Sequence, residues 1–282
     1  MTLCIAWKQN NQVHFASDSR AKIGKVSFNH AIKVFSVPVK IIGPIGPKDH
    51  HPSKYYEQNI GICFSGNILN GYTLKETLIY TLSKLQVVPG ITDVSMDQIC
   101  KLIAKFYNHY SVTLSELLFE RGLSIVLVTG YCPKLQKVRT FKFKFDIGTS
   151  VTTNFNEILV EDGDIEFIGS GETQAKILFK KITSTPPLEI LKQVIIEQKE
   201  PTVGGAIQFG EIKLRDFEVC GIRDYLIDHT SRKVTTEFYF NGLPLMEDPY
   251  AVKWDEFFIK QTFKDPFINT INQLLESGYT LK

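Results

Sequence analysis

The sequence lacks several features that would assign a protein class at once. No apolar run approaches the roughly 18 residues of a membrane span; the longest, residues 125–128, has only Leu123 beside it. Charge of one sign is not in excess, because 32 basic and 30 acidic residues leave a net charge of +2. We therefore predict neither a nucleic-acid partner nor a basic membrane patch. Hydrophobic residues make up 43% of the 282 residues and charged residues 22%, which is typical of a folded globular protein.

Cysteine is scarce and forms no recognisable pattern. The five cysteines lie far apart in the sequence, and no C-x-x-C pair occurs. An odd number of dispersed cysteines favours reduced, buried thiols, so we expect a cytoplasmic protein. The one cluster with metal-binding residue types is Asp49-His50-His51, which stands among prolines. We expect a solvated loop there, and neither a metal site nor a cofactor.

An apolar strand begins near the N-terminal end. Residues 3–8 and 12–17 read as paired strands, with the turn signal Asn10-Asn11 between them. The first residues lack the basic patch, apolar stretch and small-residue cleavage site of a secretory signal. A strand that starts so early would hold the terminus in place, where most termini fray.

Thr2 immediately precedes this early strand. Removal of Met1 would leave Thr2 with a free α-amino group at a rigid strand end. A threonine hydroxyl is a weak nucleophile until a base takes its proton, and its own amine can be that base. An α-amino group titrates near about pH 7.7–8.0, so much of it is neutral in the cytosol. A Met-Thr start alone is common and does not identify a catalyst.

Two charged residues follow Thr2 at nearly even spacing. Asp18 lies in Ser17-Asp18-Ser19-Arg20, and Lys33 opens the next apolar segment. This pattern resembles the proteasome β-subunit type of N-terminal nucleophile hydrolase, where an N-terminal threonine precedes an Asp-x-Arg segment and a lysine. It looks closest to the bacterial Anbu family and is similar, more distantly, to the HslV peptidase. We expect Arg20 to be a structural ion-pair residue.

Three later segments fit the same resemblance. Residues 60–66 read as a buried strand that ends in a small-residue turn, and Gly169-Ser170-Gly171 reads as the entry to a helix. The third segment precedes a strand and departs from the family pattern: Glu200 and Val203 stand where many proteasome subunits have Asp and Ser. The missing hydroxyl at Val203 would have helped to hold the terminal amine.

The resemblance implies roles for five residues. Thr2 Oγ1 would attack the substrate, and the Thr2 amine would carry the proton through a water. Lys33 would act as a fixed cation that favours the deprotonated forms of both groups, and Asp18 would pair with it. Ser170 would bond the amine, and the backbone N–H of Gly66 would stabilise the oxyanion.

Hydrophobic periodicity predicts the remaining elements. We expect a proline-rich loop over residues 37–59 and a helix-capping box at Ser95 and Gln98. Helices are predicted at 68–86, 95–113, 171–183 and 187–199, and strands at 60–64, 123–130, 137–145, 205–213 and 216–222.

The order of these elements predicts an α+β protein with one sandwich domain and a C-terminal extension. Residues 1–222 would form the four-layer α-β-β-α sandwich that the resemblance implies. Residues 223–282 match no family pattern and would form a C-terminal extension, packed on the core or on a neighbouring subunit. Within it we expect a hairpin near 225–240 and helices at 251–264 and 267–277, interrupted by Asp265-Pro266.

Three functions remain open from the sequence. We favour a threonine-type peptidase or amidohydrolase that cleaves a peptide or amide and assembles as a homo-oligomer, in a ring or an open helix. The second is a catalytically silent subunit that serves as an oligomeric scaffold, a reading that Val203 and the long C-terminal segment favour. The third is a different N-terminal nucleophile amidase with a small substrate. An ATP-dependent unfoldase is a partner by analogy alone.

Overall fold

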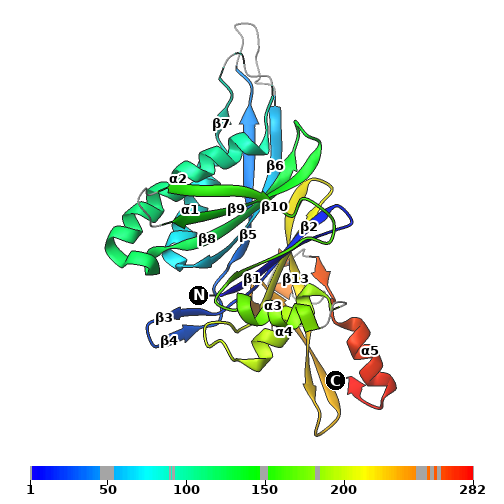
Figure 1. Ribbon diagram of the computed structural model, residues 1–282. Helices are drawn as coiled ribbons and strands as arrows, with labels where there is room; N and C mark the ends of the chain where they lie inside the picture. The colour runs from blue at the N-terminus through cyan, green and yellow to red at the C-terminus, as the bar shows by residue number, and fades with distance from the viewer. Residues whose placement is uncertain are drawn as a thin grey trace.

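The computed structural model of the protein describes residues 2–44, 54–88, 90, 93–146, 152–181, 185–245, 253–254, 257–258 and 262–281. Two large β-sheets face one another, and helices lie against them (Figure 1). The mixed α+β class predicted from the sequence is confirmed. Met1 and the Asp49-His50-His51 cluster lie outside the described residues.

The larger sheet contains the two strands predicted at the N-terminal end. It has nine strands in the order β11-β1-β2-β12-β13-β14-β15, and β18 pairs with β13 while β19 pairs with β14. The strands are β1 (Leu3–Gln9), β2 (Gln12–Asp18), β11 (Ile165–Gly169), β12 (Ile207–Lys213), β13 (Asp216–Asp228), β14 (Lys233–Phe240), β15 (Leu243–Leu245), β18 (Phe263–Lys264) and β19 (Thr280–Leu281).

The smaller sheet has six strands in the order β10-β9-β8-β6-β5-β7. They are β5 (Val34–Ile42), β6 (Lys54–Gly66), β7 (Leu85–Gln86), β8 (Ser124–Cys132), β9 (Lys137–Asp146) and β10 (Thr152–Ile158). Two separate two-stranded ribbons are β3 (Ala21–Ile23) with β4 (Val26–Phe28), and β16 (Lys253–Trp254) with β17 (Phe257–Phe258).

The four helices predicted within residues 1–222, and the one predicted at 267–277, form near the expected places. They are α1 (Ile68–Leu82), α2 (Met96–Leu118), α3 (Glu172–Lys181), α4 (Pro187–Glu197) and α5 (Ile268–Glu276), and a 3₁₀ turn at Phe119–Gly122 follows α2. The capping box at Ser95 and Gln98 is present, because each side chain bonds the backbone of the other residue. The sequence thus marks the start of α2 correctly.

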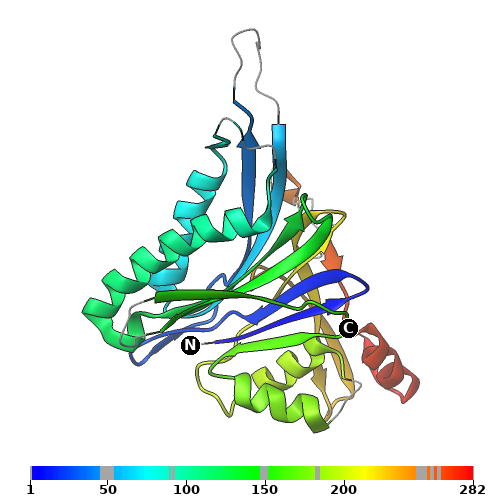
Figure 2. The same ribbon diagram turned by 45° about the horizontal axis from the view of Figure 1, so that its top comes forward.

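Successive side chains of β1 point to opposite faces of the larger sheet and so contact two different layers of the fold. Leu3 and Ile5 pack into the apolar cluster that contains residues of α4, whereas Cys4 and Ala6 face the smaller sheet. A third cluster lies between the smaller sheet and α1 and α2. Figure 2 shows α1 and α2 on one side of the paired sheets and α3 and α4 on the other. β1 is therefore buried on both faces.

The expected loop over residues 37–59 is wrong. Most of its described residues belong to β5 and β6, which pair antiparallel from Val34↔Cys63 outward. The proline content misled the prediction, because Pro38 lies within β5 opposite Asn59. Proline is tolerated at a free strand edge, and β7 pairs with the outer side of β5 only at Ile41 and Ile42.

The C-terminal segment also differs from the expectation. The predicted helix at 251–264 is wrong where the structure describes it, because residues 253–254, 257–258 and 263–264 are short strands. The second predicted helix is confirmed as α5. β13 runs through residue 222 without a break and pairs with β14, which joins the C-terminal segment to the main sheet.

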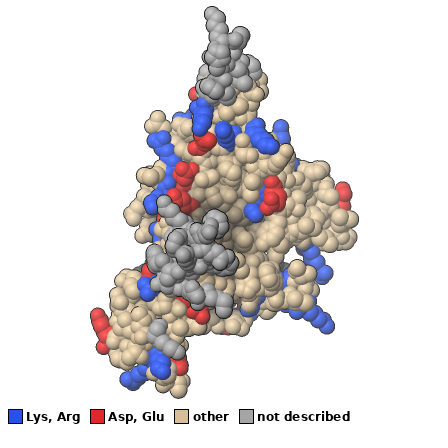
Figure 3. Space-filling view, turned by 180° about the vertical axis from the view of Figure 1, so that it is seen from behind, with Lys and Arg blue, Asp and Glu red and all other residues tan. Residues whose placement is uncertain are grey.

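The surface carries no large field of one sign on the face shown in Figure 3, where acidic and basic side chains lie intermixed. This distribution agrees with the net charge of +2. None of the helices in the described ranges is long and apolar enough to cross a membrane.

Candidate active site

The structure brings Thr2, Asp18 and Lys33 together beside the start of β1. Asp18 closes β2, and Lys33 immediately precedes β5, so the smaller sheet supplies the cation. The Thr2 hydroxyl donates to Asp18 Oδ1, and Lys33 Nζ donates to Thr2 Oγ1. Lys33 Nζ also lies 2.9 Å from Asp18 Oδ1. The three residues are 2%, 0% and 2% exposed, so their charges interact in a poorly solvated environment.

Asp18 is fully buried and richly hydrogen-bonded. In addition to the two contacts just described, its Oδ1 accepts from the backbone N–H of Leu3 at 3.0 Å. Its Oδ2 accepts from the backbone N–H groups of Arg20 at 3.1 Å and Gly204 at 3.0 Å. A carboxylate is stable inside a protein when it is paired and hydrogen-bonded in this way. Asp18 is therefore a fixed negative charge at the centre of the cluster.

The backbone at Lys33 is fixed from both sides. Its N–H donates to Gln208 Oε1 at 2.8 Å, and its C=O accepts from the N–H of Phe64 at 3.2 Å. The sequence prediction did not single out Gln208. Gln208 stands between the apolar Ile207 and Phe209 in a predicted strand, and such alternation predicts a solvent-facing polar side chain, so the sequence does not mark its burial.

Gly66 lies where β6 turns toward α1. Its φ of +110° belongs to glycine, and a Cβ there would lie 2.5 Å from the carbonyl oxygen of Leu123. The adjacent Ser65 packs against Gly169, whose own Cβ would lie 3.2 Å from Ser65 Cβ and 2.0 Å from the Thr2 carbonyl oxygen. Gly66 is thus one residue from the contact between β6 and β11, the strand that pairs with β1.

Ser170 takes part in a chain of hydroxyl groups. Its Oγ lies 2.6 Å from Thr202 Oγ1, and the Thr202 hydroxyl donates to Glu200 Oε1 at 2.8 Å. A hydroxyl has one proton, so Thr202 accepts from Ser170, and the Ser170 lone pairs stay available to accept. Ser170 Oγ lies 3.5 Å from the Thr2 carbonyl oxygen. The hydroxyl that is missing at Val203 is thus present one residue earlier, at Thr202.

Arg20 has a structural role, but the expected ion pair is wrong for the described part of the chain. Its Nε donates to Asn29 Oδ1 at 2.9 Å, and its Nη1 donates to the Val203 carbonyl at 3.2 Å. The guanidinium lies directly over Gly204, where a Cβ would come within 2.3 Å of Arg20 Cζ. Neutral acceptors therefore hold Arg20, and Gly204 leaves room for it.

The five thiols are free and buried, as expected. Cys63 lies close to the cluster, and burial, assisted by a hydrogen bond with Cys4, raises the pKa of its thiol well above the usual range. Cys4 Sγ donates to the carbonyl of Phe64 at 3.1 Å. A buried, protonated thiol is a poor nucleophile. Among these neighbouring side chains, the Thr2 hydroxyl is the candidate nucleophile.

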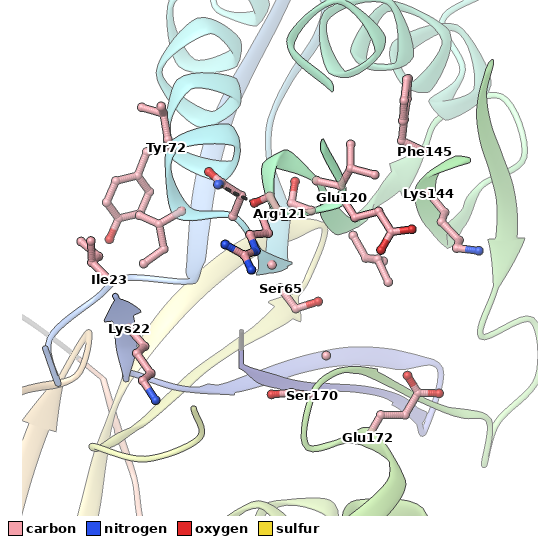
Figure 4. A pocket seen from close by; sticks show the side chains of 18 residues that line it. Lys22, Ile23, Ser65, Tyr72, Glu120, Arg121, Lys144, Phe145, Ser170 and Glu172 are labelled. Atoms are coloured by element: carbon pink, nitrogen blue, oxygen red, sulfur yellow. Dashed lines mark hydrogen bonds between the residues drawn. The ribbon is translucent and has the colours of Figure 1, made fainter. Parts of the chain in front are cut away.

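A cavity of about 930 Å³, within the size range of small-ligand sites, is lined by Ser65, Gly66, Gly169 and Ser170, but not by the buried Thr2, Asp18 and Lys33. Ser65 and Ser170 lie on opposite sides of it, and Lys22, Arg121 and Glu120 extend toward it from its rim (Figure 4). Its other lining residues are mostly apolar and include Ile23, Ile68, Leu69, Tyr72, Leu123, Ile125 and Phe145. The cavity therefore offers a largely apolar surface next to the predicted site residues.

The described residues contain no group of three or more His, Cys, Asp or Glu side chains that could hold a metal ion. The chemistry inferred below relies on the hydroxyl, ammonium and carboxylate groups already described.

Comparisons with known proteins agree with the resemblance seen in the sequence. Neither protein-family models nor curated proteins match the chain. Among solved structures, a helical assembly of the Anbu complex from Pseudomonas aeruginosa has a TM-score of 0.55 at 14% identity, covering 98% of this chain and 93% of that one.

Two further Anbu structures are similar. The Anbu protein from Yersinia bercovieri has a TM-score of 0.50 at 14% identity and covers 77% of this chain and 82% of its own. An Anbu (Gly-1) mutant from Hyphomicrobium sp. strain MC1 has a TM-score of 0.52 at 16% identity, with 78% and 84% covered. The chain therefore has the proteasome-like N-terminal nucleophile fold of Anbu structures, as the sequence predicted.

Proposed function

We propose that this protein is an N-terminal threonine hydrolase that cleaves peptide or amide bonds once Met1 has been removed. The single observation that carries the proposal is the buried contact of Thr2, Asp18 and Lys33. Ser170, whose hydroxyl lies 3.5 Å from the Thr2 carbonyl oxygen, lines the cavity. The proteasome-like fold supports it, because the same three residues are the ones that the sequence matched to the family. We also propose that the two sheets and their helices form the α-β-β-α sandwich of that fold.

The proposed reaction has two stages. The Thr2 hydroxyl oxygen attacks the substrate carbonyl, and its proton passes to the freed Thr2 amine and on to the leaving amine. The C–N bond breaks, and an ester forms on Thr2. A water then attacks the ester and gives up a proton to the same amine. The bond between the acyl carbon and Thr2 Oγ1 breaks, the amine returns the proton to Thr2 Oγ1, and the acid is released. Lys33 favours the deprotonated forms by its positive charge, and the Gly66 N–H stabilises the tetrahedral oxyanion.

The hydroxyl chain provides a place for the amine in this proposal. Ser170 has lone pairs left to accept from the Thr2 ammonium, because its own proton goes to Thr202. The negative charge of Glu200 lies at the end of this row of hydroxyl groups. It orients the hydroxyl protons of Thr202 and Ser170 toward itself and so favours Ser170 as an acceptor. Thr202 therefore replaces the hydroxyl that many proteasome subunits have at the position of Val203.

We further propose that the protein is a cytoplasmic homo-oligomer. The similar Anbu complex from Pseudomonas aeruginosa is a helical assembly. Two exposed apolar groups suit subunit contacts: Ile23, Val26 and Phe28 of the β3–β4 ribbon are 74%, 70% and 53% exposed, and Leu117 and Phe119 are 71% and 76% exposed. A catalytically silent scaffold of this kind is the second candidate function, favoured by the apolar Val203 at a position where many subunits carry serine.

The N-terminal state of purified protein tests the proposal directly. Intact mass should show that Met1 is absent, and a threonine-reactive boronate or epoxyketone should modify wild type but not Thr2→Ala. The Thr2→Ser variant, which keeps a hydroxyl and an amine, should still be modified. Quantitative retention of Met1, or equal modification of wild type and Thr2→Ala, would leave the scaffold as the function.

The division of the chain at residue 222 remains a proposal. Residues 262–281 add β18 and β19 to the main sheet, and α5 covers the same apolar cluster as α4. We propose that the C-terminal extension is a structural part of the subunit, packed on its core.

A further inference from the structure

Gln208 is a buried amide whose hydrogen bonds converge on the segment that carries Lys33. Its residue exposure is 1%, and its side chain crosses from β12 to the start of β5. Oε1 accepts from the N–H groups of Lys33 at 2.8 Å and Val34 at 3.2 Å. Nε2 donates to the carbonyl of Ala31 at 2.6 Å. Two donors face the oxygen and a carbonyl faces the nitrogen, so the network itself fixes the orientation of the amide.

The segment before Lys33 depends on such side-chain contacts. Residues 29–33 belong to no helix or strand, so their backbone groups need partners from elsewhere in the fold. The Ile32 N–H donates to the Tyr72 hydroxyl at 2.9 Å, and the Ala31 N–H donates to the Ser19 carbonyl. Gln208 bonds backbone groups on both sides of Ile32, and its amide oxygen accepts directly from the backbone N–H of Lys33.

The C-terminal hairpin packs against the same place. Asn241 and Gly242, both with positive φ, form the two-residue turn between β14 and β15. Gln208 Nε2 lies 3.4 Å from the Asn241 carbonyl, and His30 Nδ1 lies 3.1 Å from the Gly242 carbonyl. A Cβ on Gly242 would lie 2.6 Å from Ser19 Cβ and 2.9 Å from Gln208 Nε2. The turn therefore contacts the amide nitrogen of Gln208, whereas the amide oxygen faces Lys33.

We propose that Gln208 is a positioning residue that sets the place of Lys33 beside Thr2, and that the Asn241-Gly242 turn holds Gln208 there. The C-terminal segment is thereby part of the support of the active site. This inference rests on the proposed function, because Lys33 is given a role only by that reaction. Gln208 itself contacts neither Thr2 nor substrate.

The test uses full-length protein and three variants. Gln208→Met removes the amide and keeps the length of the side chain, and Gly242→Ala places a methyl group against Ser19 and Gln208. Thr129→Val is the matched control, since Thr129 is 0% exposed and bonds Thr140 away from Lys33. All variants are compared at the same interval below their own melting temperatures.

The first measurement is amide hydrogen exchange of a peptide that covers residues 31–36. Exchange should become about tenfold faster in Gln208→Met, because each lost hydrogen bond is worth about 1 kcal/mol. Gly242→Ala should accelerate the same peptide, and Thr129→Val should not. Unchanged exchange in folded Gln208→Met would overturn the inference, and unchanged exchange in Gly242→Ala would overturn the role of the turn.

The second measurement is the rate of Thr2 modification by an epoxyketone as a function of pH. Gln208→Met should slow modification about tenfold or more and shift the midpoint of its pH profile, because the distance from the Lys33 charge to the Thr2 amine changes. A change in stability alone would leave the midpoint in place. Faster exchange with an unchanged profile would refute positioning. A wild-type protein that the epoxyketone does not modify would instead refute the proposed function. The hydrogen-exchange result would then still test whether Gln208 fixes the backbone at Lys33. If Gln208→Met does not fold, Gly242→Ala serves for both measurements.

Discussion

Replacing Asp18 by Asn should destabilise the protein far more than any exposed Asp→Asn change. The carboxylate accepts five hydrogen bonds, three at Oδ1 and two at Oδ2. An amide offers one oxygen, so its NH₂ group must face at least two buried donors, each of which costs about 1–3 kcal/mol when unpaired. Lys33 also loses its counter-charge. Together these effects predict a loss of about 3–5 kcal/mol, against a typical total stability of about 5–15 kcal/mol.

Urea denaturation with two further variants separates the causes. Lys33→Met should cost less than Asp18→Asn, because Asp18 keeps four donors. Asp18→Asn instead leaves Lys33 without its counter-charge and turns an NH₂ group toward buried donors. The double variant should be more stable than the sum of the two single losses predicts. Asp228→Asn is the control, since its carboxylate also accepts backbone N–H groups but at the surface. If Asp18→Asn lies within about 1 kcal/mol of wild type, the reasoning fails.

Three other predictions concern different parts of the molecule. Thr202→Val should slow modification of Thr2 while Thr202→Ser preserves it, because the hydroxyl and not the methyl group links Ser170 to Glu200; equal rates would refute the hydroxyl chain. Phe267→Ala should cost about 3–5 kcal/mol in urea denaturation, since the ring is 3% exposed; a change below about 1 kcal/mol would show that α5 is dispensable. The pKa of Glu211 is lowered to about 2 by His14 and then Lys264, so its stabilisation is present above its ordinary pKa of 4.5 and is lost as the pH falls toward 2. In Lys264→Met, the difference between the urea midpoints at neutral pH and near pH 2.5 should therefore be smaller than in wild type. An unchanged difference would contradict this ion pair.

The part of the site that the sequence could predict lies in its first 33 residues. β1 and β2 form a hairpin with a short turn, so the distance in sequence from Thr2 to Asp18 fixes their distance in space. The period of two in these strands also predicts which side chains share a face. A local pattern is sufficient for Thr2 and Asp18, because a single hairpin carries both, whereas the position of Lys33 also depends on Gln208 and Phe64.

The contributions of Gln208 and Thr202 depend on pairings between distant segments. β12 pairs with β2 from Ile207↔Asp18, which carries Gln208 to Lys33, and no local periodicity encodes that register. Thr202 acquires its role by meeting Ser170 across the loop before β12. Such contacts exist only after the sheets have assembled.

The wrong helix at 251–264 and the overlooked turn before β15 have different physical causes. The aromatic residues between 251 and 264 suggested a helix, but β18 pairs parallel with β13 from Gly221↔Phe263, and tertiary pairing overrode the local pattern. The turn between β14 and β15 could have been found, because Asn-Gly is a strong signal for a two-residue hairpin. Attention to Asn241-Gly242 would have extended the predicted hairpin by one strand.

Under the proposed function, the burial of β1 on both faces limits the time at which Met1 can be removed. Thr2 is 2% exposed and Leu3 is 0% exposed, so an aminopeptidase that needs an extended terminus must remove Met1 before β1 is enclosed. One edge of β1 is closed by β11, which begins at residue 165. At roughly 5–20 residues per second, the ribosome takes about 10–30 s to reach that strand. The fraction of active subunits would then depend on the rate of Met1 removal relative to the rate of folding during synthesis. A subunit that folds before its Met1 is removed would keep that methionine.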